Sequence, residues 1–202
     1  MTLSARFEEG IDRLSRFALR HSTVQNFFIC VTAISFLLWQ MSERNEEIKG
    51  ITSLSVLDAR MGYTPPEAYQ LLHALGPEGR KKYLQINLYD MVLPLALAAL
   101  LSIIIGPLYH KAQLWEQVNT FPLIYMGFDL TENILIRYLL LTFPTAAPKI
   151  AFVAGELTRY KYRFFYYTLG VVGFGFIAVL RKLILEKLRG RQARAARAHH
   201  LE

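Results

Sequence analysis

The sequence predicts an all-α, integral membrane four-helix bundle with an amphipathic surface helix in its first loop and amphipathic extensions at both ends. The chain has 202 residues, 53% of them hydrophobic, and a positive mean hydropathy. This composition is too apolar for an ordinary soluble domain, and the length favours one membrane domain. Four stretches approach the ~20 residues that a helix needs to cross the hydrocarbon layer. The predicted spans are residues 22–42, 86–109, 121–143 and 163–181.

The first 21 residues are predicted to form an interfacial arm. Apolar residues recur at helical spacing while arginines occupy other faces, which is typical of an amphipathic helix. The acidic residues Glu8, Glu9 and Asp12 argue against a mitochondrial presequence, and the short apolar core of a secretory signal is missing. We therefore expect a retained helix at the membrane surface. Its apolar positions are Leu3, Phe7, Ile11, Leu14 and Ala18.

The first loop is long and contains its own helix, predicted over residues 65–75. Thr64 and Glu67 have the spacing of a capping box, and Pro65 occupies the first helical position. Gly76 is placed to end the helix. The apolar positions Ala68, Leu71, Leu72 and Leu75 share one face. We expect this face to pack on the outer end of the bundle, with a site for a separate protein as the alternative.

Residues 22–183 form the predicted membrane domain, and residues 184–202 form a basic tail. The charged residues of the loops and ends favour both termini on the matrix or cytoplasmic side. Aromatic and basic residues at the start of the fourth span are typical of a membrane interface. The expected contacts to anionic, cardiolipin-like phospholipid headgroups are Arg16, Arg20, Lys161, Arg163, Arg181 and Lys182.

The third span is unusual because it carries ionisable residues near its centre. Asp129, Glu132, Asn133 and Arg137 occupy positions i, i+3, i+4 and i+8, so they lie on one face of a helix. An unpaired charge in the bilayer is costly. We therefore predict an ion pair between Arg137 and Asp90 of the second span, within a polar network of these five residues.

Two interpretations of this network stay open. It fixes how the helices meet, or it is a transport, catalytic or ligand site in which two acids share a proton or bind an ion. No catalytic residue is assigned. If the chain is an enzyme or carrier, the candidates are Asp129, Glu132 and Asn133.

Several classes of site are not indicated. Cys30 has no partner in the chain, which excludes an intramolecular disulfide. The five histidines lie outside the spans, and no phosphate loop, nucleophile elbow or zinc-protease motif is present. We expect no cofactor, no metal and no nucleic-acid partner, since anionic lipid explains the net charge of +7.

Several motifs, taken in order, resemble a group of small uncharacterised four-span membrane proteins encoded in bacterial genomes. They are Asp58 to Ala68 (DARMGYTPPEA), Leu75 to Arg80 (LGPEGR), Asp90, and Phe128 to Asn133 (FDLTEN). The resemblance covers roughly residues 55–180 and implies a fold more than an activity.

The first functional hypothesis is a non-catalytic subunit of a larger membrane complex, such as a respiratory assembly in a mitochondrial or bacterial inner membrane. Its partners would be other membrane subunits and anionic phospholipid. The sequence does not distinguish such a subunit from a free-standing assembly factor. The alternative is a small membrane enzyme or carrier that uses Asp129 and Glu132 on a lipid-like substrate, ion or proton. A cavity that reaches these acids would favour the alternative, and a fully packed cluster would favour the subunit.

Overall fold

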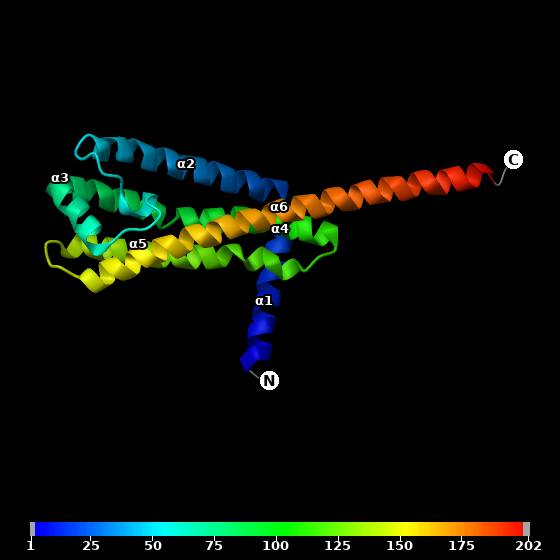
Figure 1. Cartoon of the computed structure of the whole chain (residues 1–202), viewed down its shortest axis with the longest axis horizontal. Coiled ribbons are helices and arrows are strands. Elements are labelled where there is room, and N and C mark those ends of the chain that lie inside the picture. The colour runs from blue at the N-terminus through cyan, green and yellow to red at the C-terminus, as the bar shows by residue number, and fades with distance from the viewer. Residues whose placement is uncertain (1–2, 200–202) are drawn as a thin grey trace.

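The computed structural model describes residues 3–199, with side chains for residues 3–192, and this part of the chain contains helices and no strand. Figure 1 shows the arrangement. The elements in chain order are α1 (Leu3–Arg20), α2 (Val24–Lys49), η1 (Leu57–Ala59), α3 (Pro65–Asp90), α4 (Leu93–Ala112), η2 (Glu116–Thr120), α5 (Pro122–Thr142) and α6 (Pro148–His199).

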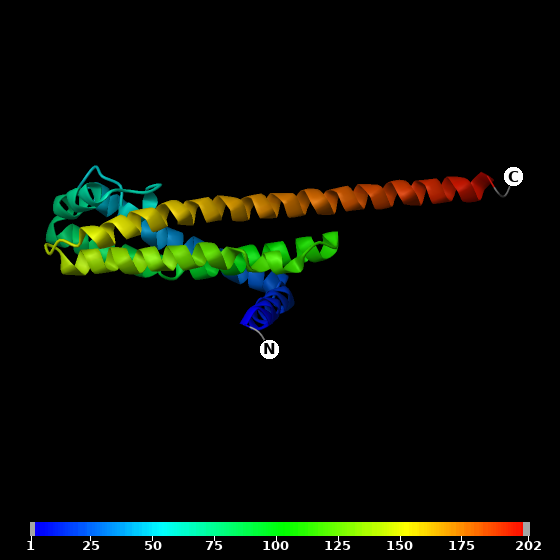
Figure 2. The ribbon, with the colours of Figure 1, turned by 60° about the horizontal axis from the view of Figure 1, so that its bottom comes forward.

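Helices α2, α4, α5 and α6 run alongside one another, and α1 lies crosswise at one end (Figures 1 and 2). Helix α6 contacts α5 and α4 along its first part and then continues alone beyond the other helices. Both α1 and the free part of α6 are therefore at the same end of the molecule. We call this end the α1 end, and the opposite end, which holds residues 50–75, the loop end.

Among the described residues, three helical segments are long and apolar enough to cross a membrane: Val24–Lys49, Gly76–Ala112 and Pro148–Gln192. These segments are typical of an integral membrane protein. Helix α5, which contains the predicted third span, is not among them. Its 21 residues include Asp129, Glu132 and Arg137.

Helix α3 begins at Pro65, where the sequence predicts the start of the first-loop helix. The Thr64 backbone N–H donates to Glu67 Oε2 over 2.6 Å, as part of a capping box, and Pro65 opens the helix. Gly76 interrupts α3 with φ of 58°, a value that glycine adopts easily. The predicted apolar face is buried: Ala68, Leu71, Leu72 and Leu75 are at most 1% exposed.

Two predicted boundaries differ in the structure. The second predicted span, 86–109, is divided between α3 and α4, since the helix is interrupted at Met91 and Val92. Pro94 explains the interruption, because proline lacks the N–H group that would donate to the Asp90 carbonyl, and that carbonyl accepts from Asn133 instead. The fourth predicted span and the tail form one helix, α6, although residues 200–202 of the tail lie outside the described residues.

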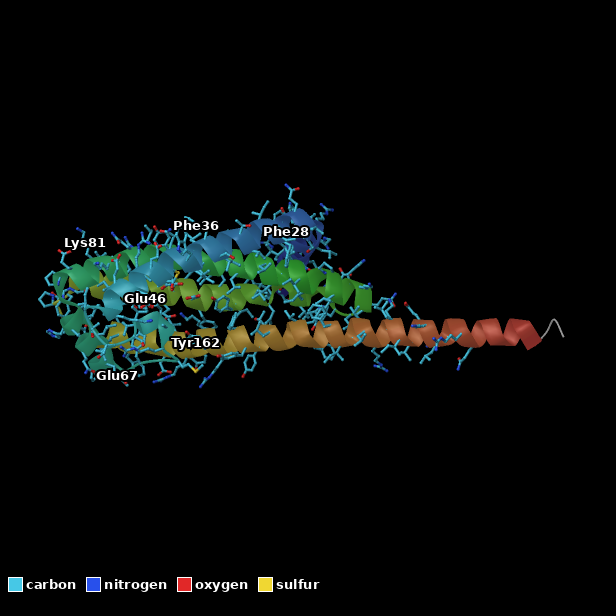
Figure 3. The ribbon with its side chains drawn as sticks, turned by 90° about the horizontal axis from the view of Figure 1, so that it is seen from above. Phe28, Phe36, Glu46, Glu67, Lys81 and Tyr162 are labelled. Carbon is cyan, nitrogen blue, oxygen red and sulfur yellow. The ribbon has the colours of Figure 1, made fainter. Side chains whose placement is uncertain are left out.

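The main hydrophobic core lies at the loop end. Its largest fully buried members include Tyr83 and Leu72 of α3, Ile48 of α2 and Ile136 of α5. Figure 3 shows the side chains: Glu46, Glu67 and Lys81 lie toward the loop end, and Phe28 and Phe36 lie along the part of α2 nearer the α1 end.

Candidate functional site

A buried lysine on α6 forms the centre of a polar cluster with two acids of α5. Lys161 Nζ lies 3.1 Å from Asp129 Oδ1 and 2.6 Å from Glu132 Oε2. All three side chains are buried, with residue exposures of 6%, 3% and 0%. Because Asp129 and Glu132 are one helical turn apart, they present their carboxylates to the same neighbour. The pairing gives both acids one shared counter-ion.

Hydroxyl and amide groups complete the hydrogen bonding of these carboxylates. Tyr125 donates its O–H to Asp129 Oδ2 over 2.6 Å, and Thr158 donates to Glu132 Oε1 over 2.6 Å. Asn133 Nδ2 donates to Asp129 Oδ1 over 3.3 Å and to the Asp90 carbonyl oxygen over 3.0 Å. The cluster therefore joins α5 to α6 and to the end of α3 through buried polar contacts.

The first loop supplies a further acid, Asp58, which precedes the turn into α3. Its carboxylate accepts a 2.6 Å hydrogen bond from the hydroxyl of Tyr83. Its backbone carbonyl accepts hydrogen bonds from Lys161 Nζ (3.3 Å) and from the Tyr162 hydroxyl (3.1 Å). Lys161 thus has three oxygen neighbours, one each from Asp129, Glu132 and Asp58, which matches the three donors of an ammonium group.

Two glycines allow the loop to lie this close to α6. A Cβ atom at Gly155 would overlap the carbonyl oxygen of Tyr63, and Gly62 has φ of 119° in direct contact with Arg159. Tyr63 is itself 3% exposed, and burial raises the pKa of its phenol. The phenol therefore stays neutral at ordinary pH and packs as a core residue.

A cavity of about 240 Å³ opens beside the cluster, and we call it the inner cavity. Three acids and the buried lysine are on its wall, which also includes apolar side chains from α4 and α6. Asp90 is only 5% exposed, and within the described side chains no ion pair is formed by its carboxylate. The lining residues that matter below are Asp58, Asp90, Asp129, Lys161, Leu97 and Phe165.

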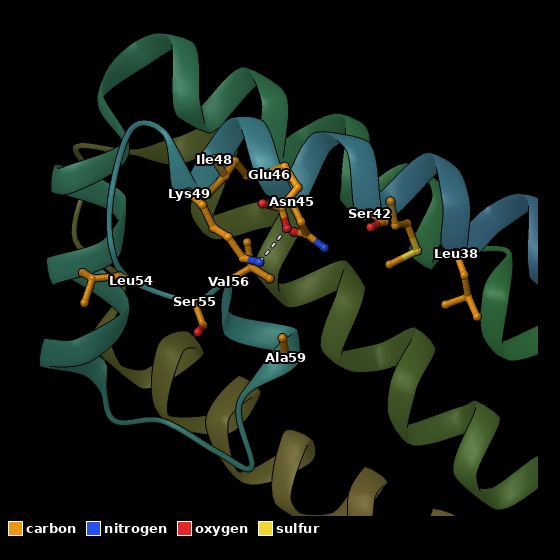
Figure 4. A pocket seen from close by; sticks show the side chains of 11 residues that line it. Leu38, Ser42, Asn45, Glu46, Ile48, Lys49, Leu54, Ser55, Val56 and Ala59 are labelled. Atoms are coloured by element: carbon orange, nitrogen blue, oxygen red, sulfur yellow. Dashed lines mark hydrogen bonds and ion pairs between the residues drawn. The ribbon is translucent and has the colours of Figure 1, made fainter.

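A second, outer cavity of about 360 Å³ lies between the last turns of α2 and residues 54–59 of the loop (Figure 4). Lys49 and Glu46 form an ion pair of 2.6 Å on its rim. The inner and outer cavities have four lining residues in common: Met41, Asn45, Val56 and Ala59. These shared residues place the acids one layer of side chains away from an open depression at the loop end.

The expected ion pair between Asp90 and Arg137 is not formed, because the cluster has a different cation. Both ion pairs of the cluster belong to Lys161, and none joins Asp90 to Arg137 among the side chains that the structure describes. Asp90, Asp129, Glu132 and Asn133 do lie together, whereas Arg137 is half-buried outside their hydrogen bonds. Arg137 lies one further turn along α5 from Asn133, beyond these hydrogen bonds.

The depth of the cluster also differs from the expectation. Met41 and Asn45 of α2 line the same cavity as Asp129 and Lys161. The exposed side chains of α2 are uncharged and mostly apolar up to Trp39, and charged residues then follow at Glu43, Glu46, Glu47 and Lys49. On the α2 side, the acids therefore lie at the end of the apolar region and not at its middle.

The predicted headgroup contacts divide into two groups. Arg16, Arg20, Arg163 and Arg181 are exposed, and Lys182 is half-buried with its Nζ donating to the Lys111 carbonyl over 2.9 Å. The prediction for Lys161 is wrong, because its ammonium group is buried against Asp129 and Glu132 and cannot reach a lipid headgroup.

Sequence reasoning did not assign Asp58, Thr158 or Lys161 to the site. For Lys161 a signal exists, since Thr158 and Lys161 are three residues apart on α6 and so share a face. For Asp58, the resemblance pattern contained the residue but gave it no role. The structure brings the DARMGY and FDLTEN segments of that pattern to one cavity, although about seventy residues separate them.

Among the described residues, no group of three or more His, Cys, Asp or Glu side chains is arranged to hold a metal ion. Comparison with family models, curated proteins and solved structures finds no match for this chain. The resemblance to small four-span bacterial proteins therefore stays a prediction.

Proposed function

We propose that the chain is a small integral membrane carrier in which α2, α4, α5 and α6 span the bilayer and the inner cavity binds a small amphiphilic cation. The observation that carries this proposal is the composition of the cavity wall. Asp58, Asp90 and Asp129 face it, and Lys161 is the cation among them. Glu132 behind Lys161 adds a fourth acid. The ionised site therefore has more negative than positive charge.

Lys161 is shared among several acids: its ion pairs are with Asp129 and Glu132, and it forms none with Asp90. A buried carboxylate without a cation is unfavourable unless it gains a proton or a positive partner. A bound cation next to Asp90 would supply that partner.

The rest of the wall selects the shape of the ligand. The apolar side chains of Leu93, Leu97 and Phe165 line the same cavity as the polar Asn45 and Asp58. A ligand that carries a positive charge next to a short apolar group satisfies both kinds of side chain. This arrangement matches the usual construction of small-molecule sites, which combine apolar walls with a few placed polar groups.

The outer cavity supplies the route from water. It is open at the loop end and shares Met41, Asn45, Val56 and Ala59 with the inner cavity. Ionisable residues within membrane segments commonly mark substrate or ion pathways. Both cavities are open, so a ligand in the outer cavity can pass along Met41 and Asn45, which line both.

The test is thermal unfolding of the purified protein in detergent with butylamine, and with butanol and butyrate as neutral and anionic controls. Binding to the folded state stabilises it by about 2.7 kcal/mol at a concentration of about 100 Kd. We expect butylamine alone to raise Tm, and Asp90→Asn to abolish the rise. Glu46→Gln, on the rim of the outer cavity, should retain it. An equal rise with butanol, or an unchanged rise in Asp90→Asn, would refute the proposal.

A second candidate is the non-catalytic subunit of a larger membrane complex, in a respiratory or other energy-converting membrane. The observation that favours it is the free part of α6. Beyond the contact of Lys182 with Lys111, it continues with Leu183, Ile184 and Leu188 between 44% and 50% exposed. Other membrane subunits and anionic, cardiolipin-like lipid would be its partners.

The particle mass after mild extraction from the native membrane separates these candidates. A stoichiometric place in a large complex supports the subunit. A monomer or small homo-oligomer without comigrating proteins supports the carrier. The same extraction from separated membranes would identify the compartment, for which we propose a mitochondrial or bacterial inner membrane with both termini on the matrix or cytoplasmic side.

A further inference from the structure

A third cavity, which shares no lining residue with the inner cavity, lies where α1 meets α4 and α5. It has a volume of about 260 Å³ and lies between α1, α4 and the start of α5. Its wall is almost entirely apolar and includes Leu14 and Phe17 of α1, Ala99 and Ile103 of α4, and Leu123 and Met126 of α5. We call it the α1 groove.

The groove exists because small residues of α4 face it. Ala98, Ala99 and Ser102 leave space that larger side chains would fill, and Leu95 and Ile103 mark its two ends on the same face of the helix. Eight residues separate these ends, which corresponds to roughly 12 Å along the axis at 1.5 Å per residue. The groove is therefore elongated in the direction of the helices and starts at α1.

Basic side chains flank the groove at its α1 end. Arg13 precedes Phe17 by four residues and Arg20 follows it by three, so both are neighbours of Phe17 on the helix surface. Arg13 is paired with Glu9. Arg16 and Arg20 are exposed, and within the described side chains neither forms an ion pair. Positive charge beside an apolar groove complements an anionic amphiphile.

The orientation of α1 indicates which amphiphile this is. The helix lies crosswise to the others at the end of the molecule (Figure 1), which is the direction of the membrane surface. Its contacts to η2 include Gln117 with Asp12 and Asn119 with the Ser15 carbonyl. These contacts leave an apolar stripe exposed between 51% and 87%, at Leu3, Phe7, Leu14 and Phe17. A stripe of this kind inserts at the boundary between headgroups and acyl chains.

We propose that the α1 groove binds one acyl chain of an anionic diacyl phospholipid whose phosphate contacts Arg16 and Arg20. The acyl chain lies along Ala99 and Met126, and the headgroup stays beside α1. The bound lipid fills the space between α1 and α4 and fixes the crosswise position of α1. This site is independent of the acidic inner cavity, so either proposal stands without the other.

The test is native mass spectrometry of the purified full chain, titrated with phosphatidylglycerol or phosphatidylcholine. We expect the wild-type chain to bind one phosphatidylglycerol molecule at least tenfold more tightly than phosphatidylcholine. Ala99→Phe fills the groove from an exposed position of α4, and it should weaken binding of both lipids at least tenfold. The double variant Arg16→Gln, Arg20→Gln should bind both lipids equally.

Gly170→Phe is the matched control, because Gly170 on α6 is exposed and a Cβ atom there meets nothing within 4 Å. It adds the same aromatic ring outside the groove and should bind phosphatidylglycerol like the wild type. Two results would overturn the proposal: unchanged binding in Ala99→Phe, or the same loss in Gly170→Phe. A charge preference that survives in the arginine double variant would overturn the headgroup assignment.

Discussion

The loop end and the α1 end of this molecule are built in different ways. At the loop end, Leu71, Leu72, Tyr83 and Ile136 are fully buried within the protein's own core. At the α1 end, large apolar residues face outward, and Phe28 of α2 and Phe176 and Ile177 of α6 are between 57% and 66% exposed. The loop end thus resembles a soluble domain, and the α1 end is suited to contact with lipid.

This difference determines where a substitution should matter. Apolar side chains that face lipid stay in an apolar environment whether the helices are packed or apart. Truncating them should therefore change the free energy of unfolding little. Core residues at the loop end lose both transfer free energy and packing. The acids and Lys161 lie at the boundary, where their hydrogen bonds join the loop to α5 and α6.

The largest expected effect is at Lys161. Lys161→Met leaves Asp129 and Glu132 buried without their cation, and breaking a buried ion pair in this way costs about 3–5 kcal/mol. Unfolding in mixed micelles should show this loss, while Lys149→Met, at an exposed position of the same helix, should stay within about 0.5 kcal/mol of wild type.

A triple variant distinguishes charge from packing at this site. Adding Asp129→Asn and Glu132→Gln to Lys161→Met removes the unpaired charges and should recover part of the lost stability. No recovery would mean that the volume of the lysine side chain, and not its charge, stabilises the cluster.

Next in size is a comparison of two truncations, one from each end. Leu72 is 0% exposed and Ile177 is 66% exposed. Leu72→Ala should cost about 2–5 kcal/mol of unfolding free energy, whereas Ile177→Ala should change it by less than about 0.5 kcal/mol. Equal losses of unfolding free energy in detergent would show that both ends are packed in the same way. That result would contradict the difference between the loop end and the α1 end.

A smaller effect is expected where the loop meets α6. Gly155→Ala places a Cβ atom against the Tyr63 carbonyl, and such overpacking costs about 1–3 kcal/mol. Gly170→Ala, with open space around it, should be neutral or stabilising by up to about 1 kcal/mol, since alanine favours helix. Similar Tm values for the two variants would mean that the loop at Tyr63 can shift to make room for the methyl group without a loss of stability.

Local patterns predicted much of the fold. The apolar face at Leu71, Leu72 and Leu75 and the break at Gly76 depend on spacing and on glycine, and both were visible in the sequence. The grouping of Asp129, Glu132 and Asn133 on one face followed from the helical repeat in the same way.

The partners of these residues were not predictable, because they depend on register between distant elements. Lys161 follows a run of mixed polar residues on α6, and only the packing of α6 on α5 places it 2.6 Å from Glu132. Asp58 reaches the same cavity through a loop whose course is set by Gly62 and Gly155. The cost of an unpaired charge in the bilayer led instead to the predicted pair between Arg137 and Asp90 of the second span.

The smallest expected effect tests the start of α3 at the loop end. Hydrogen bonds from the Thr64 hydroxyl and backbone N–H hold the pKa of Glu67 below its usual value of 4.5. A lowered pKa in the folded state means that ionised Glu67 stabilises the fold above the pKa of the unfolded chain. This contribution is lost as the pH falls through the lowered value. Tm of Glu67→Gln should therefore be slightly below that of the wild type at pH 7, and the difference should vanish in acid. A constant difference across this range would show that the cap depends on shape and not on charge.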